Sequence, residues 1–218
     1  MRDFKIDNKG TTQLYKNPIL EKLTRTNFLF PVILYYLISA FCISYLAIYR
    51  PEVKLVAYSW LFLIGLILFT LVEYLIHRFV FHFNAETEKE QQLQYNIHGV
   101  HHEYPRDKDR LVMPPVLSIF LASFFFVLFR YTIGIYGVIL FAGFVAGYST
   151  YLIIHYAVHA MKPPANFLKI YWTHHSLHHY HSVDTAFSVS FPFWDYIFGT
   201  VPHRQKDLKD SSGKGKVH

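Results

Sequence analysis

The sequence predicts an all-α integral membrane protein, in which four transmembrane helices support a helical cap on the cytosolic side. Apolar residues make up 52% of the 218 residues, and the mean hydropathy is positive, at +0.19. Four stretches of about a membrane's thickness contain no Asp, Glu, Lys or Arg. The net charge of +6 therefore fits basic flanks of membrane helices better than a nucleic-acid-binding surface.

The apolar stretches differ in how well they suit a membrane span. Pro114-Pro115 limits the usable helix of the third to Val116–Phe129, so this span is expected to be short or tilted, with only Arg130 marking the turn into the fourth. Gly143 and Gly147 of the fourth have GxxxG spacing, which permits close helix contact but also occurs in ordinary apolar helices. The four stretches are Phe28–Tyr49, Leu55–Val72, Leu111–Phe129 and Tyr131–Ile154.

Charge predicts the domain organisation and the orientation. Residues 1–27 form a polar N-terminal arm without the features of a signal peptide, with a membrane-surface helix expected near Asn17–Arg25. Residues 28–200 form the membrane domain, and residues 201–218 a polar tail. Basic residues concentrate in the arm, the 82–110 loop and the C-terminal segment, so both termini and this loop should face the cytosol. The single cysteine, Cys42, excludes a disulfide framework.

Twelve of the fourteen histidines lie between positions 77 and 181, and ten of them fall into four short motifs. On a helix, the i, i+3 and i+4 spacings of HGVHH, HYAVH and HSLHH direct the imidazoles of each motif to one face. HRFVFH has i, i+5 spacing, which requires a helix end or a break near Val80–Phe83 or ligands that reach a metal from two sides. The ten histidines are His77, His82, His98, His101, His102, His155, His159, His175, His178 and His179.

The predicted topology gathers all four motifs on the cytosolic side. A lone histidine at a helix end is usually structural, but ten in helical spacings on one side are not explained by packing. They suffice for two metal ions with about five ligands each, and imidazole suits iron, zinc, copper and nickel. A closed structural zinc site would need only four. Two metals at a membrane surface indicate oxygen chemistry on a substrate dissolved in the bilayer.

The order HX4H, HXXHH, HXXXH, HXXHH resembles the fatty acid hydroxylase/sterol desaturase superfamily of membrane di-iron enzymes. The segments HRFVFH, IHGVHHEYPRDKDRLVMPP and FWDYIFGT look most like the fatty acid 2-hydroxylases. The resemblance implies that the ten histidines bind two iron ions, with zinc as a substitute in purified protein, and that O2 is the co-substrate. It also implies hydroxylation at or near C2 of a fatty acyl chain, free or in a sphingolipid or ceramide.

Three features depart from that pattern. The chain has no room for the cytochrome b5 domain that many eukaryotic members carry, so the electron donor is expected to be separate, either cytochrome b5-like or a ferredoxin with its reductase. Leu152 stands where an aspartate is common, and Ala186–Ser188 stands in place of Gly-Phe-Gly. These two changes bear on substrate and regiochemistry rather than on the metal centre.

Other residues near the last motif are candidates for roles beside the ligands. The aromatic stretch Phe187–Phe198 suits an interfacial wall for an acyl chain, or simple membrane anchors. His203 and His218 lie outside every motif and are expected to have no role in turnover. The candidates for residues that support the metal ligands are His174, Tyr180, His181 and Asp184.

Alternative functions remain open at the level of sequence. Other reactions of the superfamily, such as oxidation or desaturation of a sterol, carotenoid or alkane, would use the same histidines. A metal transporter would need polar groups through the middle of the membrane. Within the apolar stretches the third offers only Ser118 and Ser123, and Glu73 follows the second, so an enzyme is favoured.

Overall fold

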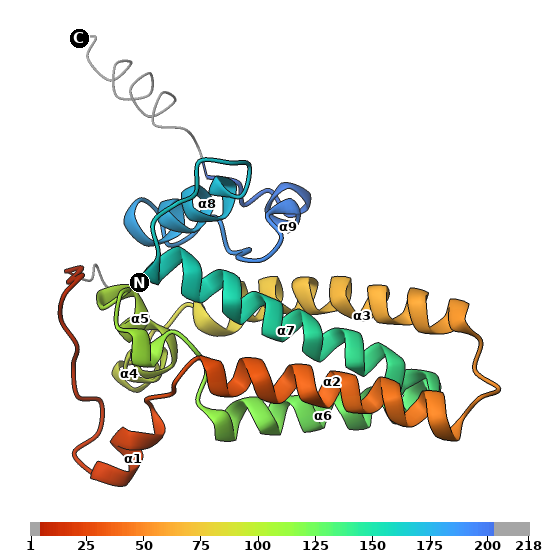
Figure 1. Ribbon diagram of the computed structural model, residues 1–218. Coiled ribbons are helices and arrows are strands. Elements are labelled where there is room, and N and C mark those ends of the chain that lie inside the picture. The colour runs from red at the N-terminus through yellow and green to blue at the C-terminus, as the bar shows by residue number, and fades with distance from the viewer. Residues whose placement is uncertain (1–4, 203–218) are drawn as a thin grey trace.

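The computed structural model describes residues 5–202, and these residues contain helices and loops but no strand. The chain forms a bundle of four long helices with a cap of short helices at one end (Figure 1). The α-helices are α1 (Pro18–Leu23), α2 (Leu29–Tyr49), α3 (Leu55–Ile76), α4 (Glu88–Gln94), α5 (Val100–Glu103), α6 (Pro115–Ile133), α7 (Tyr136–Ala160), α8 (Lys169–Tyr180) and α9 (Phe193–Ile197).

Helices α2, α3, α6 and α7 are long and apolar enough to cross a membrane, which confirms the four predicted spans. Helix α7 is the central one, because it packs against each of the other three. Two thirds of the 18-residue apolar stretch of α7 is buried inside the protein, compared with 28% or less for the apolar stretches of the other three helices. The apolar outer faces of the other helices are therefore left for lipid.

Small residues let α3 and α7 approach closely. A Cβ atom added to Gly65 of α3 would lie 2.2 Å from the carbonyl oxygen of Leu140, and one added to Gly143 of α7 would lie 2.1 Å from that of Phe62. At Gly147 a Cβ would meet the side chain of Phe69 at 2.8 Å. The two glycines of the GxxxG spacing thus serve helix contact.

Both predicted ends of the third span are wrong. Helix α6 is longer than the expected Val116–Phe129, because Pro115 occupies its first position, where a proline costs no hydrogen bond. Arg130 does not mark the turn, which instead follows Ile133 at Gly134, a residue with φ 63°. Helix α3, in contrast, ends at Ile76 as expected, directly before His77, and backbone N–H groups of a distant loop bind the Glu73 carboxylate within it.

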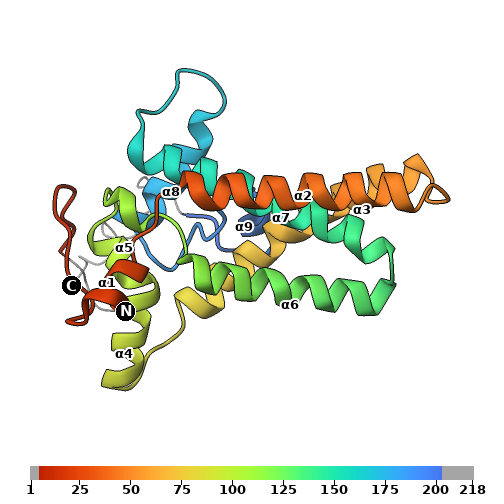
Figure 2. The ribbon, with the colours of Figure 1, turned by 60° about the horizontal axis from the view of Figure 1, so that its bottom comes forward.

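The cap covers the end of the bundle at which α3 and α7 finish (Figures 1 and 2). Its first helix, α1, lies within the range predicted for a surface helix and begins after Asn17, whose side chain caps it. The Glu21 carboxylate of α1 pairs with the buried Arg110 guanidinium, which holds α1 against the rest of the cap. The cytosolic position of the cap remains a prediction.

Candidate metal centre

All ten motif histidines meet where the bundle joins the cap. Nine are buried and His82 is half-buried. They come from four segments: the end of α3, the α4–α5 region, the end of α7, and α8. The prediction that the four motifs gather at one end of the bundle is therefore confirmed.

A π-helical turn brings the two histidines of the HRFVFH motif together despite their i, i+5 spacing. Residues 77–81 form a π-helical segment at the end of α3, and the His82 N–H donates to the His77 carbonyl at 3.1 Å. This turn brings the two rings to 4.9 Å between centroids. The predicted break near Val80–Phe83 is thus a helix end preceded by one wide turn, a feature that often marks functional sites.

A second π-helical turn divides the HGVHH motif. His98 lies in the π-helical segment Tyr95–Gly99, whereas His101 and His102 lie in α5. The motif was expected to direct all three rings to one place on a straight helix. Instead His98 and His102 face one group of histidines, and His101 faces another.

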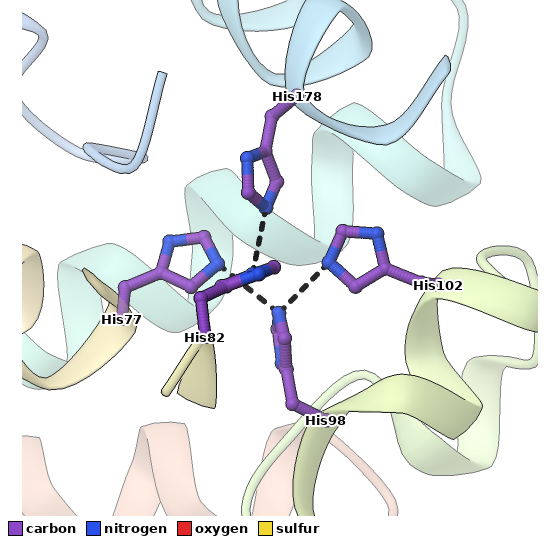
Figure 3. A group of neighbouring side chains, drawn as sticks. All are labelled: His77, His82, His98, His102 and His178. Carbon is purple, nitrogen blue, oxygen red and sulfur yellow. Dashed lines mark hydrogen bonds between the residues drawn. The ribbon is translucent and has the colours of Figure 1, made fainter. Parts of the chain in front are cut away.

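The first group brings five ring nitrogens within 4.8 Å of one another. Figure 3 shows the rings turned toward a common point. The Nε2 atoms of His77 and His98 are 3.1 Å apart, and those of His98 and His102 are 3.0 Å apart. The members are His77, His82, His98, His102 and His178.

Backbone carbonyls set the tautomers of two members of this group. The Nδ1–H of His178 donates to the Thr185 carbonyl at 2.7 Å, and that of His77 donates to the Phe187 carbonyl. The Nε2 atom of each of these two rings is then unprotonated, and its lone pair faces the other rings. Lone pairs that converge in a buried space fit a bound cation, and such hydrogen bonds from the outer nitrogen are typical of metal-binding histidines.

The second group lies beside the first. His101, His155, His159 and His175 also bring one nitrogen each within 4.8 Å of the others. The Nδ1–H of His155 donates to the Leu111 carbonyl at 2.9 Å, which leaves its Nε2 free to face His101 at 3.2 Å. This group therefore also brings imidazole nitrogens together in a buried space.

His179 lies between the two groups. Its ring centroid is 4.6 Å from that of His175 and 4.7 Å from those of His101 and His159, and it stacks on His102 at 4.2 Å. Both of its nitrogens are buried without a hydrogen-bond partner among the described residues. A buried imidazole without a hydrogen-bond partner is suited to act as a further ligand of an ion bound by the second group.

Burial and mutual repulsion keep these imidazoles neutral. Burial, followed by the neighbouring histidines, lowers the pKa of His98, His101 and His178 well below 6.5, and that of His102 to about 3. A metal ligand must be unprotonated, so the site is already in the required state at pH 7.

Two buried carboxylates hold the loop that carries those carbonyls. Asp195 is fully buried and accepts hydrogen bonds from the Phe187 and Ser188 N–H groups at 2.9 and 3.0 Å. Glu73 of α3 accepts the Val189 N–H at 2.6 Å. Sequence analysis missed Asp195, although an acid within the aromatic stretch Phe187–Phe198 is a signal that could have found it.

The candidate supporting residues fall in different places. His174 is buried, and its Nε2–H donates to Asp195 at 2.9 Å, so it contacts the carboxylate that holds the Phe187–Ser188 loop. Tyr180 is exposed and donates to the Asn8 side chain at 2.7 Å. His181 and Asp184 are exposed. His203 and His218 lie outside the described residues.

The two sequence departures have distinct surroundings. Leu152 is 1% exposed and packs in an apolar cluster with Val32 and Val112, against which Tyr148 and Tyr151 also pack. Ala186 has φ 56°, in the left-handed region that favours glycine. The backbone thus keeps a glycine-like turn at this position although the residue is alanine.

An apolar cavity extends from the first group into the bundle. It lies between α3, α6 and α7. His77, Glu73 and Tyr151 line it near the histidines, and Phe69 and Phe125 line it further into the bundle. Helices α3 and α6 both pack on α7 but hardly on one another, so the cavity lies under a gap between them. Such a space suits an alkyl chain.

These features define a multi-pass helical membrane protein with a histidine cluster suited to metal ions. A family model described as fatty acid hydroxylase matches residues 62–200, and the chain belongs to this family.

Known relatives agree with this assignment. The chain is 38% identical over 154 residues to a fatty acid 2-hydroxylase of Rattus norvegicus, covering 68% of this chain and 41% of that one. It is 35% identical over 199 residues to the ceramide very long chain fatty acid hydroxylase scs7 of Schizosaccharomyces pombe, covering 88% and 55%. The chain thus spans about half the length of these relatives. A solved structure of full-length scs7p, with only the hydroxylase domain visible, matches with a TM-score of 0.79 at 32% identity, covering 88% and 73%.

Proposed function

We propose that this protein is an O2-dependent hydroxylase of fatty acyl chains, free or in a sphingolipid or ceramide, that acts at or near C2. The observation that carries the proposal is the position of two neutral histidine groups at the end of an apolar cavity. The relatives named above as fatty acid and ceramide hydroxylases support the substrate class.

The ten histidines would hold two iron ions, five around each of two centres. The first centre would use the five histidines of the first group, and the second centre would use the four of the second group together with His179. Bound iron would supply the O2-activating redox chemistry that side chains lack. Zinc also suits imidazole and would compete for the same nitrogens during purification.

The protein's own residues would position the acyl chain. The alkyl part would lie in the cavity beside Phe69 and Phe125, with water excluded by the apolar lining. The head would remain at the cap end, because burying a polar headgroup among α3, α6 and α7 would be costly. Carbons close to the carboxyl end would then lie nearest His77, which favours attack at C2 or a neighbouring carbon.

The reaction requires electrons from outside the chain. Hydroxylation converts R–H, O2, two electrons and two protons into R–OH and water. A separate cytochrome b5-like protein, or a ferredoxin with its reductase, would supply the electrons. Basic flanks support a membrane domain of residues 28–200 whose cap, N-terminal arm and polar tail all face the cytosol.

Product analysis in a lipid-defined host tests the proposal. Cells that express the protein should accumulate 2-hydroxylated acyl chains, identified by mass spectrometry of derivatised lipids, and cells that express His178→Ala at matched levels should not. A product oxidised at mid-chain or at the methyl end would contradict the geometry. The absence of any oxidised lipid from iron-loaded, reduced protein would contradict the activity.

A further inference from the structure

A polar cleft reaches the second histidine group from the cap side. It lies between the end of α7, the following turn and α8, and Arg106 contributes to its lining. His159, His175 and His179 form part of its wall. We propose that this cleft is the docking surface for an acidic one-electron carrier protein. The proposal rests on the proposed function, since only a redox reaction needs such a partner.

Charge carries the argument for an acidic partner. Arg106, Lys162 and Lys169 line the cleft and are exposed, and none of them forms an ion pair with another residue in the range 5–202. The lining residues, all of which are described, include no Asp or Glu. Three cations without counter-charges attract an acidic surface and steer it toward the cleft.

The rim of the cleft provides apolar contacts between these charges. Met161, which lines the cleft, is 63% exposed, and Phe167, in the same connection between α7 and α8, is 83% exposed. The Trp172 indole N–H donates to the Met161 carbonyl at 3.0 Å, which ties this rim to α8. Exposed Met and aromatic residues beside basic ones have the composition of a protein interface. Small, charge-steered interfaces are typical of transient redox partners.

The position of the cleft leaves the acyl chain undisturbed. The apolar cavity reaches the cluster at His77, in the first group, whereas the cleft reaches His159, His175 and His179. A carrier and a lipid could therefore be bound at the same time. Because imidazoles of the second group line the cleft, a docked carrier would approach the redox centre without a conformational change in the bundle.

Charge reversal tests the docking surface. The test variant is Lys162→Glu/Lys169→Glu, and the matched control is Lys16→Glu/Lys89→Glu, which changes two exposed lysines elsewhere by the same charge. Binding of a soluble cytochrome b5 domain and of a plant-type ferredoxin is measured with full-length, metal-loaded protein in nanodiscs. We expect the test variant to bind at least one carrier about tenfold or more weakly at low salt, with the difference disappearing near 1 M salt. The control should stay within about twofold of the wild type.

A second measurement separates this proposal from the proposed function. Dithionite with methyl viologen reduces the protein anaerobically without docking. After the excess reductant is removed and O2 is added, all variants should form the same single-turnover yield of hydroxylated lipid. If carrier affinity is equal in all variants, the docking proposal is wrong, whatever the activity. If the test variant instead weakens use of the lipid substrate under chemical reduction, the cleft is a headgroup site and the docking proposal is also wrong. No product from any variant under chemical reduction would overturn the proposed function, while the binding result would still decide the docking surface.

Discussion

Replacement of Asp195 by Asn should loosen the loop that orients two histidines of the first group. The Asp195 carboxylate accepts four hydrogen bonds, two on each oxygen. One oxygen accepts from the Phe187 N–H and the Thr200 hydroxyl, and the other accepts from the Ser188 N–H and His174. Burial raises the pKa of Asp195, but hydrogen bonds from His174, Thr200 and Ser188 outweigh this and hold it below its usual value.

An asparagine at this position has one accepting oxygen and one donating amide. Thr200 can rotate its hydroxyl toward Tyr74, 3.0 Å away, and His174 can change tautomer. Whichever way the amide turns, either the Phe187 or the Ser188 N–H loses its acceptor. One buried, unsatisfied N–H costs about 1–3 kcal/mol, which corresponds to a decrease in Tm of roughly 2–12 °C for a chain of this size.

The assay is thermal unfolding of purified protein in detergent, together with metal content. Asp195→Asn should unfold at a lower temperature and retain less metal, since the Phe187 carbonyl orients His77. Asp184→Asn is the matched control, because Asp184 is exposed, and its Tm should change by about 2 °C or less. Wild-type Tm and metal content in Asp195→Asn would refute the role of this carboxylate.

Four further outcomes are expected. Elemental analysis should approach two metal ions per chain, and saturation at one would contradict the dinuclear site. His178→Ala should form no hydroxylated product at matched expression, whereas His218→Ala should form normal amounts. Ala186→Gly should raise the free energy of unfolding by about 1 kcal/mol, because glycine adopts φ 56° without steric cost; unchanged denaturation would argue against strain there. Ala122→Phe should fill the apolar cavity and shift the products toward shorter acyl chains, while Ser123→Phe, on the exposed face, should not.

The long helices and the gathering of histidines were predictable because both depend on local patterns. An apolar run without charges specifies a span, and i, i+3, i+4 spacing specifies a face. The errors arose at helix ends. Pro115 and Arg130 looked like boundaries, but proline is tolerated in a first turn, and the arginine is simply part of the last turns of α6.

The hydrogen bonds that hold the histidines and the neighbouring loop in place could not be predicted, because they join segments that are distant in the sequence. Glu73 binds residues 116 and 117 positions later in the chain. His77 and Phe187 are 110 positions apart. Nothing near Glu73 in the sequence indicates that a loop returns to it. Likewise, the spacings of HGVHH and HSLHH each identify three candidate ligands, but not that His101 and His175 belong to a different group from His98, His102 and His178.

Two short helical segments each contribute histidines to both groups, and this affects how metal ions bind to the site. The α4–α5 region contributes His98 and His102 to one group and His101 to the other, and α8 divides His178 from His175 in the same way. An ion bound in either group would fix backbone that also carries ligands of its neighbour, so the second ion would bind at a smaller loss of conformational entropy. We therefore expect positive cooperativity in metal uptake, with half-filled protein sparsely populated during titration.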